Sequence, residues 1–131
     1  EVGDVSLKSQ VPETPSGICA VLAETDVINM VSRGISTPDI IKGIHLSIAG
    51  RVVKLLSSLK AESPIVLTGG MALNKGMVQA IEELAKESKY DWEMCTDPNA
   101  SYAGAIGAAL WGGYRYNKLK EKDNNFVFQK Q

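Results

Sequence analysis

Aromatic side chains, histidine and cysteine are scarce in this chain of 131 residues. Phe, Trp and Tyr make up 6% of the residues, with one histidine (His45) and two cysteines (Cys19 and Cys95). Nucleic-acid bases stack on aromatic side chains, so a base-stacking protein is not expected. Two cysteines make no disulfide framework, and without CxxC spacing they give zinc little support. A single histidine with no suitable carboxylate spacing offers no catalytic triad.

An excess of charge and a long apolar run are also missing. The chain has 14 basic and 15 acidic residues and a net charge of −1, which gives nucleic acid or an acidic membrane no electrostatic attraction. No stretch approaches the roughly 20 apolar residues of a membrane span. The first residues lack the basic start and apolar run of a targeting segment. We therefore expect a cytoplasmic protein with no nucleic acid and no membrane as partner.

The composition that remains suits one folded domain. The apolar fraction is 44% and the mean hydropathy is −0.05, so the chain can bury a core. Its length allows one domain but not two ordinary ones.

The amino-terminal part of the chain gives weak structural signals. Prolines and a glycine interrupt residues 1–17, which are expected to be irregular. The apolar run at residues 18–23 is either a buried strand or the entry to a helix. A short helix then covers residues 24–33 and ends at Gly34.

The clearest predicted element is a long helix that begins near Thr37. Thr37 is a good N-cap, and Pro38 fits the first helical position, where no N–H is needed. Apolar side chains then recur every three or four residues, which predicts one continuous buried stripe over about five turns. The stripe consists of Ile41, Ile44, Ile48, Val52, Leu55 and Leu59.

Strands and helices alternate in the rest of the chain. The predicted elements are a buried strand at residues 65–67, a helix at 74–86, a strand at 91–95 and a helix rich in small residues at 101–117. A polar tail, residues 118–131, is expected to fray. This order predicts an α/β fold with a sheet covered by helices. Two or three strands are few, because sheets average about 5–6, so part of the domain is expected outside this chain.

A glycine turn follows the first predicted strand. Open α/β sheets bind ligands beyond the carboxyl ends of their strands, where Thr68-Gly69-Gly70 lies. Paired glycines let a backbone approach a ligand closely and tolerate positive φ, and the next helix points free N–H groups to the same place. A tight turn without any ligand is the alternative. No Gly-Lys-Ser/Thr follows, so the turn is not a P-loop.

The cysteines, the histidine and the small-residue helix each allow a structural interpretation. Cys19 lies among apolar residues and suits core packing. It cannot hold an iron–sulfur cubane alone, since this takes four thiolates, although two chains giving two each would suffice. Cys95 suits a structural role, and His45 a partly buried place beside the apolar stripe. The small residues of 101–117 favour close packing, or the wall of a nucleotide cleft.

Four segments together resemble one family of ATPases. They read ICAVLAETDV (residues 18–27), IIKGIHLSIA (40–49), LTGGMALNKG (67–76) and YAGAIGAAL (102–110). Jointly they resemble the BadF/BadG/BcrA/BcrD-type ATPases, which include the ATPase subunits of benzoyl-CoA reductase and the activators of 2-hydroxyacyl-CoA dehydratases. The resemblance covers about residues 5–117. The segment after Cys19 is more similar to the reductase subunits.

The resemblance implies a fold and a mechanism. The fold is the carboxyl-terminal subdomain of an actin-like (sugar kinase/Hsp70/actin), ribonuclease H-like ATPase, over residues 1–117. The family pairs two ATPase subunits around one shared [4Fe–4S] cluster. ATP, with Mg²⁺, helps drive a low-potential electron from reduced ferredoxin or flavodoxin, through the cluster, to a CoA-ester reductase or dehydratase component.

The resemblance also assigns residues. Cys19 matches a cluster ligand. The residues implied on the adenosine side of the nucleotide are Gly69, Gly70, Met71 and Asn74, with Lys42 and His45 added by fold analogy.

The chain departs from the family pattern in one large way. The Asp-Gly-rich phosphate segments and the first cluster cysteine have no counterpart here, so we expect a fragment without catalytic residues and without ATPase activity. The alternatives are a dehydratase activator, half of a sugar or acetate kinase, and an actin-like nucleotide-binding module with no redox role.

Overall fold

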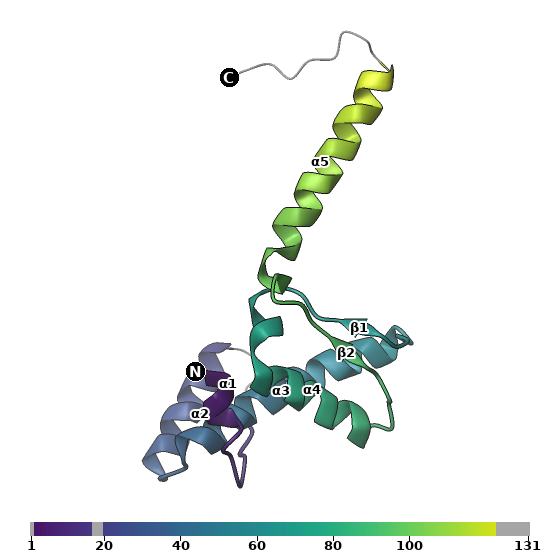
Figure 1. The fold of residues 1–131 in the computed structure, drawn as a ribbon. Helices are drawn as coiled ribbons and strands as arrows, with labels where there is room; N and C mark the ends of the chain where they lie inside the picture. Colours follow the sequence, from purple (N-terminus) through teal and green to yellow (C-terminus); the bar gives the residue numbers. More distant parts are fainter. Residues whose placement is uncertain (1, 17–19, 123–131) are drawn as a thin grey trace, which may run out of the picture.

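The computed structural model describes residues 2–16 and 20–122 (Figure 1). Five α-helices, two 3-10 turns and two short strands follow in the order α1 (Val2–Ser6), α2 (Ala20–Ser32), α3 (Thr37–Ser58), β1 (Ile65–Val66), η1 (Gly70–Leu73), α4 (Lys75–Glu87), β2 (Met94–Cys95), η2 (Ala100–Tyr102) and α5 (Ala103–Lys122).

The two strands form a parallel pair. Ile65 lies opposite Met94 and Val66 opposite Cys95. The backbone N–H groups of Ile65 and Leu67 donate to the carbonyls of Glu93 and Cys95, each at 2.8 Å. Parallel strands need a crossover, which α4 supplies. The α/β class is therefore confirmed, although the strands are shorter than expected, and Val66 is exposed rather than buried.

The core lies between α3 and α4, on one side of the strand pair. Its buried members are Ala49, Val53, Met77, Ala80, Ile81 and Ala85. Leu67, Trp92 and Met94 pack against this cluster from the strands and the segment before β2. Tyr90 stacks on Trp92 at a centroid distance of 4.2 Å, and the Trp92 Nε1–H donates to the carbonyl of Ala61 at 2.9 Å. The end of α3 is thereby tied to the strands.

Helix α3 begins one residue earlier than predicted. Its N-cap is Ser36, whose Oγ accepts from the Asp39 N–H at 3.3 Å. Thr37 is therefore the first helical residue rather than the cap. Pro38 still falls in the first turn, where its missing N–H costs nothing.

The predicted buried stripe of α3 is wrong for this chain. Ile48 is exposed, and Leu55 and Leu59 keep 63% and 76% of their surface exposed. The buried face is instead the neighbouring one, formed by Ile40, Lys42, Gly43, His45, Ala49 and Val53. The physical reason is that α1 and α4 pack on this second face, so contacts rather than apolarity alone decide burial.

The amino-terminal region is more ordered than predicted. Residues 2–6 form α1, which packs against α3 and α4 and buries Gly3 and Ser6. Of the two alternatives for residues 18–23, the helix holds from Ala20 onward, where α2 begins. Residues 18 and 19 lie outside the described residues.

Helix α5 continues past Asn117 to Lys122. Lys118 and Glu121 form an ion pair one turn apart, at 3.6 Å. Within the described part of the chain, α5 buries none of its residues, and in Figure 1 it projects away from the other helices. The close packing predicted for its small residues is therefore not made with the described residues.

Candidate nucleotide-binding site

The glycine turn has the shape that the sequence predicts. Gly69 has φ +87° and ψ 177°, a conformation that side chains with a Cβ rarely adopt. Its N–H donates to the carbonyl of Ala100 at 2.8 Å, and its carbonyl accepts from Ala72 at 3.1 Å. A Cβ added at Gly69 or Gly70 would meet no described atom within 4 Å. Both glycines therefore present open backbone.

A hollow of about 350 Å³ lies beside this turn. It is lined by Val2, Gly3, Asp4, Gly70, Leu73, Asn74 and Lys75. Its size falls in the range of small-molecule sites, about 300–1,000 Å³. Two of the predicted adenosine residues, Gly70 and Asn74, are thus brought together, and α1 supplies the opposite wall. Sequence reasoning missed that wall because it predicted no helix there.

Asn74 begins helix α4. Its Oδ1 accepts from the Met77 N–H at 3.2 Å, the bond of an N-cap. Its own N–H donates to the carbonyl of Met71 at 3.1 Å. Asn74 therefore links the end of η1 to the start of α4, whose unpaired N–H groups favour an anionic group.

Met71 and Gly69 lie on the same turn but outside this hollow. Met71 is exposed and borders a smaller hollow of about 160 Å³, together with Ile48 and Val52 of α3. Gly69 lines neither hollow. Their contact with a nucleotide stays a prediction.

Lys42 and His45 point to protein partners. Lys42 is 8% exposed, and its Nζ donates to Glu83 Oε2 at 2.5 Å. Glu83 Oε1 also accepts from Gln79 Nε2 at 2.7 Å. His45 is 3% exposed; its Nδ1 lies 3.1 Å from Ser6 Oγ and its Nε2 3.3 Å from Asn74 Nδ2. Neither lines the hollow of about 350 Å³, so their predicted contact with adenine or ribose remains a prediction.

The pKa of His45 is lowered from its usual value of 6.5. Burial of the ring is the main cause, and the positive charge of Lys42 adds to it. The ring is therefore neutral at pH 7, with one nitrogen donating and the other accepting.

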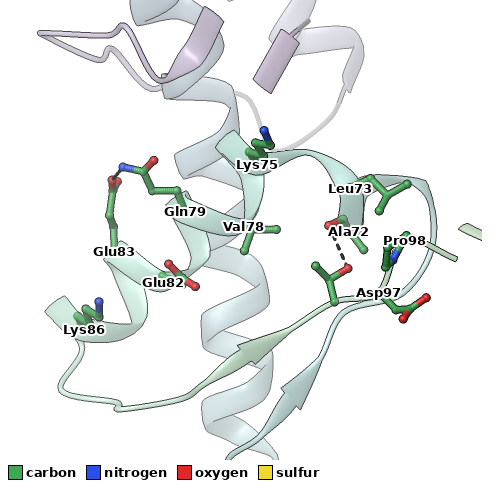
Figure 2. A pocket seen from close by; sticks show the side chains of 11 residues that line it. Ala72, Leu73, Lys75, Val78, Gln79, Glu82, Glu83, Lys86, Asp97 and Pro98 are labelled. Carbon is green, nitrogen blue, oxygen red and sulfur yellow. Dashed lines mark hydrogen bonds between the residues drawn. The ribbon is translucent and has the colours of Figure 1, made fainter. Parts of the chain in front are cut away.

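A second hollow, of about 790 Å³, lies on the other side of η1 (Figure 2). The α4 side chains Lys75, Gln79, Glu82, Glu83 and Lys86 line one side, and Asp97 and Pro98 the other. Thr96 Oγ1 donates to the carbonyl of Ala72 at 3.3 Å across this hollow. Its charges are mixed and exposed, and they favour no single class of ligand.

The predicted cluster ligand Cys19 lies outside the described residues. Cys95 on β2 is half-buried and has no disulfide. In the described ranges, no three His, Cys, Asp or Glu side chains gather as a metal site. No helix in residues 2–16 and 20–122 combines the length and apolar character that a membrane crossing requires.

The β1–η1–α4–β2 unit, with its glycine turn beyond the strand, defines the class: the carboxyl-terminal subdomain of an actin-like nucleotide-binding fold. Solved structures share it. The activator of the 2-hydroxyisocaproyl-CoA dehydratase from Clostridium difficile with bound ADPNP superposes over 100% of this chain with a TM-score of 0.75 and 33% identity. Component A of the Acidaminococcus fermentans (R)-2-hydroxyglutaryl-CoA dehydratase gives a TM-score of 0.72 and 38% identity over 84% of this chain.

The chain belongs to the BadF/BadG/BcrA/BcrD ATPase family, which residues 1–112 match. It is 55% identical to a benzoyl-CoA reductase subunit of Thauera aromatica over 91% of its length. It is 40% identical to the (R)-2-hydroxyglutaryl-CoA dehydratase activating ATPase of Acidaminococcus fermentans over 90%.

The chain spans less than half of these relatives. It covers 43% of the Thauera protein and 42% of the Acidaminococcus ATPase. It covers 46% and 40% of the two solved chains.

Proposed function

We propose that this chain is the carboxyl-terminal half of an ATP-coupled electron-transfer subunit that serves a benzoyl-CoA reductase. The observation that carries the proposal is the 55% identity to the Thauera benzoyl-CoA reductase subunit over nearly the whole chain. The dehydratase activators are less similar, at 36–40% identity. The chain's role is to bind the adenosine side of ATP and to respond to the state of the nucleotide.

The glycine turn would hold the adenosine. Open backbone at Gly69 and Gly70 permits close approach of the ribose or base, and the Asn74 side chain lies at the edge of the adjoining hollow. The N-terminus of α4 favours the negative phosphates. We propose that the groups for Mg²⁺ and the γ-phosphate lie in another part of a longer protein.

The electron would pass through a [4Fe–4S] cluster shared with a second ATPase subunit. Cys19 would supply one thiolate from this chain; a cubane takes four, so the partner subunit and a further cysteine in each chain must supply the rest. The acceptor would be a CoA-ester reductase component, and the donor reduced ferredoxin or flavodoxin.

A pair of cysteine variants tests the electron-transfer role. In the full-length protein, purified without oxygen, Cys19→Ser is expected to abolish the brown colour and the bound iron. Cys95→Ser is the matched control and is expected to keep both, because Cys95 sits half-buried on β2. A Cys19→Ser protein with full iron content contradicts the proposal and favours a nucleotide-binding module without redox function.

The isolated chain is expected to hydrolyse no ATP. Phosphate release should stay at the level of a buffer blank with Mg²⁺ present, because the residues proposed to hold the metal and γ-phosphate are outside residues 1–131. Magnesium-dependent turnover by the pure chain overturns the division of labour proposed here.

A dehydratase activator is the second candidate, favoured by the two solved structures that share the fold. The full-length protein is assayed with each partner component, ATP and a low-potential donor. Reduction of benzoyl-CoA supports the first candidate, and dehydration of a 2-hydroxyacyl-CoA supports the second.

A further inference from the structure

We propose that His45 is a positioning residue for the nucleotide, which it reaches through the side chain of Asn74. The inference rests on the proposed function, because it takes the hollow beside Gly70 as the nucleotide site. It departs from a direct contact between His45 and the ligand.

The hydrogen bonds around His45 fix its tautomer. Ser6 Oγ has one proton and donates it to the carbonyl of Gly3 at 2.8 Å. Toward His45 Nδ1, at 3.1 Å, Ser6 Oγ must therefore accept, and Nδ1 carries the proton. In a neutral ring this leaves Nε2 as an acceptor.

Asn74 completes this chain of bonds. Its Oδ1 is occupied by the Met77 N–H at 3.2 Å, so its Nδ2 is the atom that faces His45 Nε2, at 3.3 Å. A donor thus meets an acceptor. His45 fixes the orientation of the Asn74 amide, and with it the N-cap of α4.

The surroundings make this arrangement difficult to replace. Ser6 and His45 are both buried, so water cannot easily take over a lost bond. A Cβ at Gly76 would overlap Ser6 Oγ and lie 3.0 Å from His45 Nδ1. The first turn of α4 therefore rests directly on the Ser6–His45 pair.

The same residues border the proposed ligand. Asn74 lines the hollow of about 350 Å³ with Gly70, and its N–H holds the carbonyl of Met71 at 3.1 Å. A shift of the Asn74 side chain would move the end of η1 and the first turn of α4 together. His45, though buried, thereby sets the geometry of the surface that the nucleotide meets.

Two variants of His45 separate the roles of its nitrogens. Glutamine can place an amide oxygen near the position of Nε2, whereas asparagine reaches only the position of Nδ1. In the full-length protein, ADP binding measured by calorimetry is expected to change less than about threefold in His45→Gln and to weaken about tenfold in His45→Asn. Both variants lose some thermal stability.

A matched control removes a hydrogen bond at the other end of α3. Ser57→Ala breaks the bond between Ser57 Oγ and Tyr90 Oη, which is 2.5 Å long and half-buried. It is expected to lower stability without changing ADP affinity. Equal ADP affinities in His45→Gln and His45→Asn, or losses that simply follow stability as in Ser57→Ala, overturn the proposal.

Hydrogen exchange separates this inference from the proposed function. The Met77 amide, which donates to Asn74 Oδ1, is expected to stay protected in His45→Gln and to lose protection in His45→Asn, with or without nucleotide. If the unmodified protein binds no ADP, the proposed function fails. The Met77 amide still decides whether His45 holds Asn74, and equal protection in both variants refutes it.

Discussion

The carboxylate of Asp39 joins two segments that lie far apart in the sequence. Its Oδ1 accepts from Ser9 Oγ at 2.7 Å and from the N–H groups of Gln10 and Val11 at 2.9 Å each. Its Oδ2 accepts from Ser36 Oγ at 2.5 Å. One side chain thus fixes the path of the chain after α1 onto the first turn of α3.

These bonds make Asp39 a source of acid sensitivity. The hydrogen bond from Ser36, followed by those from Ser9 and Val11, holds the pKa of Asp39 far below its usual value of 3.8. A lowered carboxylate pKa adds stability that is present above pH 3.8 and is lost as the pH falls below it. Asp39→Ala is expected to remove this acid-sensitive contribution.

Amide exchange at Gln10 and Val11 provides the measurement. In Asp39→Ala both amides should exchange nearly as fast as in an unfolded peptide, because their acceptor is gone. Asp26→Ala in the neighbouring helix is the comparison; it removes the acceptor of the exposed Ser16 Oγ and should leave both amides protected. Unchanged protection in Asp39→Ala would show that other contacts hold the segment.

His45 gives a second pH effect, in a higher range. Since its folded-state pKa is lowered, the unfolded chain binds more protons below pH 6.5, and stability is lost as the pH falls through that range. The charged groups on the elements around the ring are Lys42 and Glu83, which pair with each other, and Asp4 and Lys75, which line the hollow. Urea midpoints should be lower at pH 5.5 than at pH 7.5, and the difference should shrink in His45→Gln. An equal difference in that variant would assign the effect to other groups.

At the scale of the element, α3 contains two glycines with opposite requirements. A Cβ at Gly43 would overlap the backbone carbonyl of Glu13, which has no freedom to move aside. A Cβ at Gly50 would meet only the Leu84 Cδ1, at an ordinary 3.8 Å. The same helix therefore uses one glycine for close approach and gains nothing structural from the other.

Two alanine substitutions test this difference. Gly43→Ala is expected to lower the free energy of unfolding by at least about 1–3 kcal/mol through overpacking. Gly50→Ala is expected to raise it by about 0.5–1 kcal/mol, because alanine favours the helix and the site has room. Urea denaturation of both variants is the measurement, and changes of the same sign would contradict the packing described for residue 43.

The elements show which features local sequence determines. The Asn74 cap, the positive φ of Gly69 and the inward side chains Met77 and Ile81 depend on nearby residues, and they were predictable. The buried face of α3 depends on where α1 and α4 pack, and the apolar stripe through Leu55 and Leu59 did not show it. The charged Lys42 is buried because Glu83, forty-one positions along, meets it, and periodicity cannot show such a pairing.

The same distinction holds for the candidate site. The glycine turn came from a local motif, and the structure placed Gly70 and Asn74 on one hollow. Its opposite wall, from Val2 to Asp4, and the Ser6–His45–Asn74 bonds join residues separated by about thirty to seventy positions. No spacing within one segment signals such contacts.

At the scale of the whole molecule, the described chain exposes much apolar surface. The outer face of α3 leaves Ile48, Leu55 and Leu59 uncovered, and α5 exposes Ile106, Leu110, Trp111 and Tyr114. A groove of about 510 Å³ between the strands and the start of α5 is also lined by Val66, Ile106 and Leu110. Apolar faces of this extent are typical of surfaces that a further part of a protein covers, which agrees with a chain that spans under half of its relatives.

A charge placed on α5 tests that interpretation in two contexts. In the 131-residue chain Leu110 is 70% exposed, so Leu110→Glu is expected to change the free energy of unfolding by no more than about 0.5 kcal/mol. In the full-length protein, where we propose that α5 is covered, the same change would bury an unpaired carboxylate and cost about 2–4 kcal/mol. Lys120→Glu, at an exposed site on the same helix, should be nearly neutral in both. Urea denaturation of the two proteins side by side is the measurement. A Leu110→Glu effect as small in the full-length protein as in the chain would mean that α5 stays uncovered there, and that the apolar face serves another partner.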